Sequence, residues 1–199
     1  SGQDEYPEEI DAWLGQNGAC HILVNNTGGP APGPAASMTV EALQAGFDSL
    51  LATPHVLVQA VVPGMKRAAF GRIVNVASTS VKQPIANLAV SNVIRAATAA
   101  WAKTLSQELA AFGITVNNVL PGYTDTERLA EIFEMRASKA GGGPEAVAKA
   151  RADTIASIPA GRLGLPEEIA AAVGFLASPA AAYVNGINLP VDGGRLGTL

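Results

Sequence analysis

A run of small polar side chains follows a strongly apolar segment near the middle of the chain. The sequence GRIVNVASTS contains Ser78, and Ser91 and Arg95 follow thirteen and seventeen residues after it. Hydroxyl groups donate and accept hydrogen bonds, whereas a guanidinium only donates and stays protonated. These residues could therefore bind a carbonyl or an anion, but none of them is suited to shuttle a proton near neutral pH.

Three roles remain open for this trio. In the first, Ser78 and Ser91 hydrogen-bond a substrate carbonyl while Arg95 supplies positive charge to a ribose, carboxylate or phosphate. In the second, the residues are structural: Ser78 satisfies backbone groups and Arg95 pairs with an acid. In the third, the proton donor lies elsewhere, and Tyr123 in PGYTDT is the candidate phenol.

Alternating apolar strands and helices must position these side chains. Buried strands are expected at 21–26, 73–76 and 114–120, with a last short strand in GINLPVDGG. Helices are expected from residue 7 to Gly15 or Gly18, and at 40–66, 88–112 and 166–178. Continuous apolar strands that alternate with helices predict a parallel α/β sheet covered on both faces.

The polar stretches NNTGG, ASTS and PGYTDT each follow one of the predicted strands. In open parallel sheets, ligands bind beyond the carboxyl ends of the strands. The sequence therefore predicts one site at this edge of the sheet, formed by residues that lie far apart along the chain.

Individual residues predict where several helices begin, bend and end. Thr39 suits the N-cap of a long helix, and Pro54 should bend or break that helix. Gly113 should end the helix before it. Residues 127–158 are expected to form a helical insertion with a flexible hinge at Gly141 to Pro144.

Composition argues against several classes of partner. The net charge is −4 and the basic residues are scattered, which does not favour nucleic acid, and no uninterrupted apolar segment indicates a membrane span. Cys20 is the only cysteine, which fits a reducing cytoplasm, and His21 and His55 lack metal-ligand spacing. Trp13 and Trp101 are expected in a core or an interface.

Four segments together resemble the short-chain dehydrogenase/reductase family. They are ILVNNTGG, GRIVNVAS, GITVNNVLPGYTDT and the C-terminal IPAGRLGLPEEIAAAVGFLAS with YVNGINLPVDGG. The resemblance implies a doubly wound, Rossmann-like parallel sheet that lacks its first βαβαβ portion. Residues 1–199 would form a single partial domain of this type, with 127–158 as a substrate lid.

The resemblance also implies catalytic positions, and here the sequence departs from the family. Ser78 lies at the position of the family's catalytic serine. Counting without gaps places Ser91 and Arg95 where the family has tyrosine and lysine, and a gapped count gives Leu88 and Asn92 instead.

Cofactor contacts are implied on two sides of a dinucleotide. They are Asn26, Thr27 and Gly28 on the adenosine side, and Pro121, Gly122 and Thr126 on the nicotinamide side. The structural alternative is that Asn25 and Asn26 tie strands together through side-chain bonds to backbone, while Pro121 and Gly122 form a turn.

The function implied is an oxidoreductase that uses NAD or NADP and acts on the carbonyl or secondary alcohol of a small molecule, as in 3-oxoacyl carrier-protein reductases. The family's glycine-rich cofactor turn is not found in the sequence, so we expect these 199 residues alone to bind a dinucleotide weakly and to turn over slowly or not at all. A non-catalytic scaffold is the alternative. In it, strand 21–26 is an exposed sheet edge, and helices 40–66 and 88–112 assemble a homodimer or homotetramer.

Overall fold

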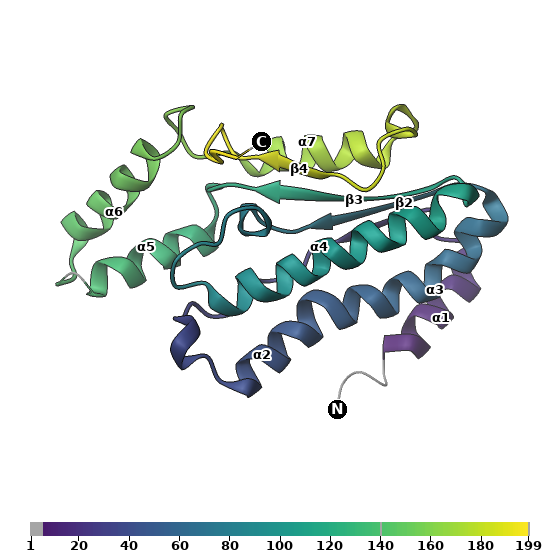
Figure 1. Ribbon diagram of the computed structural model, residues 1–199, viewed down its shortest axis with the longest axis horizontal. Helices are drawn as coiled ribbons and strands as arrows, with labels where there is room; N and C mark the ends of the chain where they lie inside the picture. Colours follow the sequence, from purple (N-terminus) through teal and green to yellow (C-terminus); the bar gives the residue numbers. More distant parts are fainter. Residues whose placement is uncertain (1–5, 140, 199) are drawn as a thin grey trace.

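The computed structural model describes residues 6–139 and 141–198 as a four-stranded parallel sheet with helices on both faces (Figure 1). The strands are β1 (Ile22–Asn25), β2 (Gly71–Val76), β3 (Ile114–Pro121) and β4 (Asn188–Val191). The helices are α1 (Tyr6–Asn17), α2 (Val40–Phe47), α3 (Thr53–Ala68), α4 (Ala89–Leu109), α5 (Glu127–Lys139), α6 (Pro144–Ala156) and α7 (Pro166–Ala177). The α/β class expected from the sequence is confirmed.

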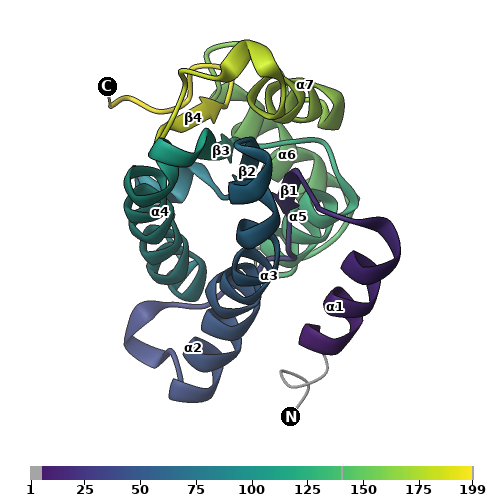
Figure 2. The same ribbon diagram turned by 90° about the vertical axis from the view of Figure 1, so that its right-hand side faces the viewer.

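The strands pair in the order β1-β2-β3-β4, and all three pairings are parallel. Helices α3 and α4 cover one face of the sheet and α7 covers the other (Figures 1 and 2). Because every strand runs in the same direction, the polar stretches after β1, β2 and β3 emerge at one edge.

Two hydrophobic clusters hold these layers together. On the α3/α4 face, Met65, Ile73 and Ile114 are fully buried. On the α7 face, Val74, Val119 and Leu176 form a smaller cluster. Side chains alternate between the two faces along each strand, so both β2 and β3 contribute to both clusters.

Strand β1 is only half covered, which corrects the expectation of a fully buried strand. Ile22 and Val24 are 48% and 43% exposed, whereas Leu23 packs against the α3/α4 cluster. Val24 is in register with Val74, so it faces the α7 side, and the α7 cluster includes no residue of β1. The expectation that this strand forms a sheet edge is confirmed.

A chain of asparagine side chains crosses all four strands on the α3/α4 face. Asn25 Nδ2 donates to Asn75 Oδ1 at 2.8 Å, Asn75 Nδ2 to Asn118 Oδ1 at 2.9 Å, and Asn118 Nδ2 to Asn188 Oδ1 at 2.7 Å. The four residues are in register at each pairing. The expectation that Asn25 ties neighbouring strands together through its side chain is confirmed. Its expected backbone partner is wrong, because the neighbouring strand presents an amide side chain at the same level.

The predicted helix has Thr39 as its N-cap, and its regular α-helical geometry is interrupted just before Pro54, both as expected. Thr39 Oγ1 accepts from the Ala42 N–H at 3.1 Å, and the chain passes through a π-helical turn at Asp48–Ala52 just before Pro54. Proline has no N–H, so the carbonyl of Leu50, four residues earlier, is free, and it accepts from Thr98 Oγ1 of α4 at 3.0 Å. The irregular turn before Pro54 therefore allows a hydrogen bond that connects this helix to α4.

The continuous run Val40–Ala68 is long and apolar enough to cross a membrane by length and composition, where none was expected from the sequence. Its Val58, Val61 and Met65 belong to the main core, however, as they would in a core helix of a globular domain. Trp101 also packs against this core, as expected, whereas Trp13 is 51% exposed.

Helices α5 and α6 occupy the segment expected to be a helical insertion, and they extend beyond one end of the sheet (Figure 1). Leu129 and Phe133 of α5 form a cluster with Ile158 and Leu163 of the segment after α6, and side chains of α6 pack against this cluster. Gly141, Gly142 and Gly143 connect the two helices with φ angles of 103°, 77° and 91°.

Candidate active site

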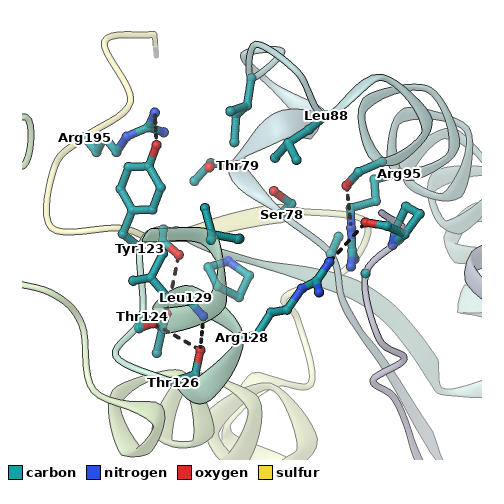
Figure 3. Close-up of a pocket in the computed structure, with 18 residues that line it drawn as sticks. Ser78, Thr79, Leu88, Arg95, Tyr123, Thr124, Thr126, Arg128, Leu129 and Arg195 are labelled. Carbon is teal, nitrogen blue, oxygen red and sulfur yellow. Dashed lines mark hydrogen bonds between the residues drawn. The ribbon is translucent and has the colours of Figure 1, made fainter. Parts of the chain in front are cut away.

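A cleft of about 280 Å³ opens where β2 and β3 end. Its walls come from the segments after these strands, from the start of α4, from α5 and from the C-terminal segment (Figure 3). The lining residues are Gly29, Pro30, Ala77, Ser78, Thr79, Ile85, Leu88, Ser91, Arg95, Pro121, Gly122, Tyr123, Thr124, Thr126, Arg128, Leu129, Ile132 and Arg195. A cleft thus lies at the carboxyl edge of the sheet, where the sequence predicts the site.

Ser78 lies two residues beyond β2, where the chain leaves the sheet and forms a short 3-10 turn at Thr79–Val81. Its Oγ accepts a hydrogen bond from the Ser80 N–H at 3.1 Å. Because an acceptor site of the hydroxyl is occupied in this way, its O–H remains available to donate. Ser78 thus presents a hydrogen-bond donor to the cleft, supported by backbone.

Ser91 and Arg95 lie one turn apart on α4 and contact each other. Arg95 Nε donates to Ser91 Oγ at 3.3 Å, and Arg95 Nη1 donates to the carbonyl of Val76 at the end of β2 at 3.0 Å. Desolvation by burial lowers the pKa of Arg95. The guanidinium is therefore fixed between the sheet and α4, and it lines the cleft.

The structural role considered for Arg95 required an acid as its partner. No carboxylate in residues 6–139 and 141–198 forms an ion pair with Arg95. That part of the structural interpretation is wrong. Ser78, in contrast, does accept from a backbone N–H, as the structural interpretation expected, and this bond does not use its O–H.

Tyr123, the alternative phenol, lines the cleft on the side of the C-terminal segment. Its hydroxyl accepts from Arg195 Nη2 at 3.5 Å, and the Arg195 guanidinium lies 4.5 Å from the centre of the tyrosine ring. Figure 3 shows the phenol directed toward Arg195, across the view from Arg95. The only hydrogen-bond partner of the Ser78 side chain in the described residues is Ser80, so Tyr123 and Ser78 do not form a bonded pair.

The α5 side of the cleft carries a third arginine. Arg128 Nη1 pairs with Glu131 Oε2 at 3.1 Å on the same helix, and Arg128 Nη2 donates to the Pro30 carbonyl at 3.2 Å. Arg128 therefore ties α5 to the loop after β1. Its charge is compensated at least in part by Glu131, whereas that of Arg95 is not.

The predicted cofactor residues divide into two groups. Pro121, Gly122 and Thr126 line the cleft, whereas Asn26, Thr27 and Gly28 do not. Gly122 N–H donates to the Val191 carbonyl at 3.0 Å, so Pro121 and Gly122 continue the pairing with β4 rather than forming a turn. A Cβ at Gly122 would lie 2.7 Å from Cα of Asp192, so only glycine fits this contact.

Several lining residues were missed by the sequence reasoning. Ile85, Leu129 and Ile132 supply apolar surface, and Arg128 and Arg195 supply charge. Arg128 follows PGYTDT closely and could have been suspected from that position. Arg195 gives no local signal, because only β4 pairing with β3 brings the C-terminal segment to the cleft.

No group of three or more His, Cys, Asp or Glu side chains in the described part of the chain could hold a metal ion. Cys20 is a partly buried residue that packs against the main core, and its thiol donates to the Ile22 carbonyl.

Comparison with known proteins agrees with this architecture. The family described as "Enoyl-(Acyl carrier protein) reductase" matches residues 3–195, and the chain belongs to this branch of the short-chain dehydrogenase/reductase family. A 3-oxoacyl-[acyl-carrier-protein] reductase of Vibrio cholerae is 35% identical over 192 residues, which cover 94% of this chain and 73% of that protein.

Two further relatives extend this similarity. An acetoacetyl-CoA reductase of Shinella zoogloeoides is 35% identical over 178 residues, covering 89% of this chain and 68% of its own. The solved structure of an NADPH-dependent reductase involved in bacilysin biosynthesis has a TM-score of 0.89 at 30% identity, covering 96% of this chain and 73% of that one. The relatives support a carbonyl reductase kind of function.

The described residues fit only part of a nicotinamide dinucleotide. The cleft offers hydroxyl and guanidinium donors at Ser78, Ser91 and Arg95, which suit a ribose and a nicotinamide amide, whereas the Thr126 hydroxyl donates to the Thr124 carbonyl at 3.3 Å. The loop after β1 does not resemble a phosphate cradle, since a Cβ added at Gly28 or Gly29 meets no atom within 4 Å. The prolines in this loop also lack the N–H groups that a diphosphate needs.

Proposed function

We propose that the protein is a carbonyl reductase of the 3-oxoacyl reductase type, which uses NAD or NADP and acts on a small molecule. The observation that carries this proposal is the donor at Ser78, held by the Ser80 N–H, at the point of the cleft where β2 ends. A parallel sheet places its ligands at this edge, and the relatives named above are reductases.

In this proposal Ser78 donates a hydrogen bond to the substrate carbonyl. A bound nicotinamide would supply the hydride. Ser78 and Ser91 then stabilise the negative charge that develops on the carbonyl oxygen, a kind of stabilisation that is usually the largest single contribution to catalysis. Arg95, beside Ser91, supplies positive charge to another group of the bound molecules. Arg95 cannot deliver the proton, because a guanidinium does not deprotonate readily in a protein.

The proton has two candidate sources. Water has access to the open cleft, and Tyr123 carries a phenol on the opposite side. Because general acid catalysis contributes about 10²–10⁴-fold, an enzyme that takes its proton from water is expected to be slow compared with one that uses a poised tyrosine.

The segment 127–158 is proposed to act as the substrate lid. Leu129 and Ile132 of α5 line the cleft, and the three glycines before α6 adopt positive φ angles. We also propose a cytoplasmic location, supported by the single cysteine and by the kind of relatives that match.

A second candidate function is an oligomeric scaffold without turnover. The observation that favours it is exposed apolar surface on the two long helices: Val40 is 76%, Phe47 41% and Val93 48% exposed. A homodimer or homotetramer through α2, α3 and α4 would cover such surface. Assembly and catalysis are compatible, so this candidate differs from the first only in its lack of activity.

The test uses the full-length protein and a panel of small ketones and acyl thioesters with NADH and with NADPH. Ser78→Ala is expected to lower kcat about 10²–10³-fold, as for loss of one donor to an oxyanion. Ser37→Ala, an exposed serine outside the cleft, is the matched control and should leave kcat unchanged.

Light scattering on the same samples separates the two candidates. A reductase loses rate in Ser78→Ala while its assembly stays the same. No turnover with any member of the panel, together with an intact oligomer, would reject the reductase in favour of the scaffold.

A further inference from the structure

We infer that the cleft binds the carboxylate of a small oxo acid, with Arg95 as the counter-ion of that carboxylate. The inference deepens the proposed function and rests on it only for the carbonyl half of the ligand. The carboxylate half follows from the burial, the hydrogen bonds and the charges of the cleft itself.

The first observation is that no carboxylate among the described residues compensates the positive charge of Arg95. Its guanidinium carries five N–H groups, of which the described residues account for two, at Ser91 Oγ and at the Val76 carbonyl. Withdrawing a charge from water costs free energy unless a partner compensates it, and a bound anion would provide that partner.

The second observation is that the floor of the cleft offers donors. The oxygen of Ser78 accepts from Ser80 N–H, and the oxygen of Ser91 accepts from Arg95 Nε. Both hydroxyl hydrogens are therefore free to point at a ligand, as are the remaining N–H groups of Arg95. Figure 3 shows Ser78 and Arg95 on the same side of the cleft, and no Asp or Glu lines it.

The third observation sets the charge of the ligand. Of the three lining arginines, Arg128 is paired with Glu131, and Arg195 lies against the ring of Tyr123. Arg95 is held most firmly, between sheet and helix. Arg195 also lacks a carboxylate partner among the described residues, but it lies on the Tyr123 side of the cleft. The single guanidinium beside Ser78 matches a singly charged carboxylate better than a phosphate, which carries about −1.5 to −2 charges at pH 7.

The fourth observation sets the size of the ligand. The cleft measures about 280 Å³, and Ile85, Leu88, Leu129 and Ile132 give part of it an apolar lining. A short oxo acid places its carboxylate at Arg95, its carbonyl oxygen at Ser78 and its few carbons against these side chains. The planar guanidinium can bind a carboxylate through two parallel hydrogen bonds.

The test measures binding to the full-length protein by calorimetry, without cofactor, so that it does not depend on turnover. The probes are acetoacetate, its uncharged methyl ester, butyrate as an acid without the carbonyl, and inorganic phosphate. We expect both acids to bind and the ester to bind at least about tenfold more weakly, because it loses hydrogen bonds to a charged group.

Two variants locate the interaction. Arg95→Met is expected to weaken acetoacetate binding about 10- to 100-fold, and Arg95→Lys should restore part of it by returning the charge. Arg67→Met, which removes an exposed arginine on α3, is the matched control and should change nothing. If Arg95→Met does not fold, the comparison of acid with ester on the unsubstituted protein still decides.

Equal affinity for acid and ester, phosphate binding without carboxylate binding, or equal losses in the Arg95 and Arg67 variants would each overturn the inference. Its failure is distinguishable from failure of the reductase proposal. Reduction of ketones with no preference for acids keeps the reductase and rejects the carboxylate site. Binding of butyrate without reduction of any ketone keeps the carboxylate site and rejects the reductase.

Discussion

One wall of the cleft belongs to the sheet, and the wall opposite belongs to α5. The sheet wall carries Ser78 and Arg95, which are bonded to the backbone at and just after the end of β2, the strand whose Ile73 is fully buried in the α3/α4 cluster. The α5 wall carries Leu129 and Ile132 and packs mainly with α6, beyond the end of the sheet. The polar groups of the cleft are thus on the wall that is bonded to the sheet, and much of its apolar surface is on the wall that packs mainly with α6.

The largest expected effect comes from removing support under the sheet wall. Ile73→Ala should lower the free energy of unfolding by about 2–5 kcal/mol, because Ile73 is fully buried and leaves a cavity. Ile132→Ala on the half-buried α5 wall should cost only about 1 kcal/mol. Urea denaturation measures both, and equal losses would contradict the difference between the walls.

A smaller effect is expected where α5 connects to α6. Gly142 has a φ of 77° and a Cβ there would meet no atom, so Gly142→Ala adds only backbone strain, about 1–2 kcal/mol. Gly174→Ala, inside α7 and equally free of contacts, is the matched control and should stabilise the protein by about 0.5–1 kcal/mol. Thermal unfolding should therefore shift in opposite directions, and a gain of stability in both variants would show that the connection is not held in this conformation.

The smallest effect concerns the point where the chain returns from α6 to the sheet. Glu168 of α7 accepts from Arg162 Nη2 and from the Leu165 N–H, and these contacts lower its pKa to about 2. A carboxyl with a depressed pKa stabilises the fold above its unfolded value of 4.5, and this contribution is lost as pH falls from there toward 2. Both groups are exposed, so the change is small.

The test of this pH dependence compares the unfolding midpoints of Glu168→Gln and of the unsubstituted protein. The difference between their unfolding midpoints should be largest near neutral pH and shrink between pH 4.5 and pH 2. A difference that grows as the pH falls would have the wrong sign for this ion pair.

The sequence was sufficient for the strands, the long helices and the edge of the sheet where the cleft lies. Apolar runs bounded by residues such as Thr39 and Gly113 carry that information locally. The exposure of Ile22 and Val24 could not be predicted, because an apolar run in the sequence does not show which other elements will pack over it. That Arg95 has no acid partner among the described residues could not be predicted either, since it depends on which side chains the fold brings near.

The part of the site that the sequence did not predict is formed by distant segments. Arg195 reaches Tyr123 only through the pairing of β3 with β4, and Arg128 reaches Pro30 only because α5 packs beside the loop after β1. The asparagine chain is of the same kind: each amide is visible in the sequence, but their alignment requires the register of three strand pairs.

In that asparagine chain every amide donates in the same direction, from β1 toward β4. Turning Asn75 or Asn118 alone would bring two NH₂ groups together on one side and two oxygens on the other, and turning Asn25 or Asn188 alone would create one such mismatch. The four amides can therefore keep their bonds only if they all reverse together. The four strands are thereby held in a fixed register at the level of Asn75, and the position of Ser78, three residues further along the chain, depends in part on amides of the neighbouring strands.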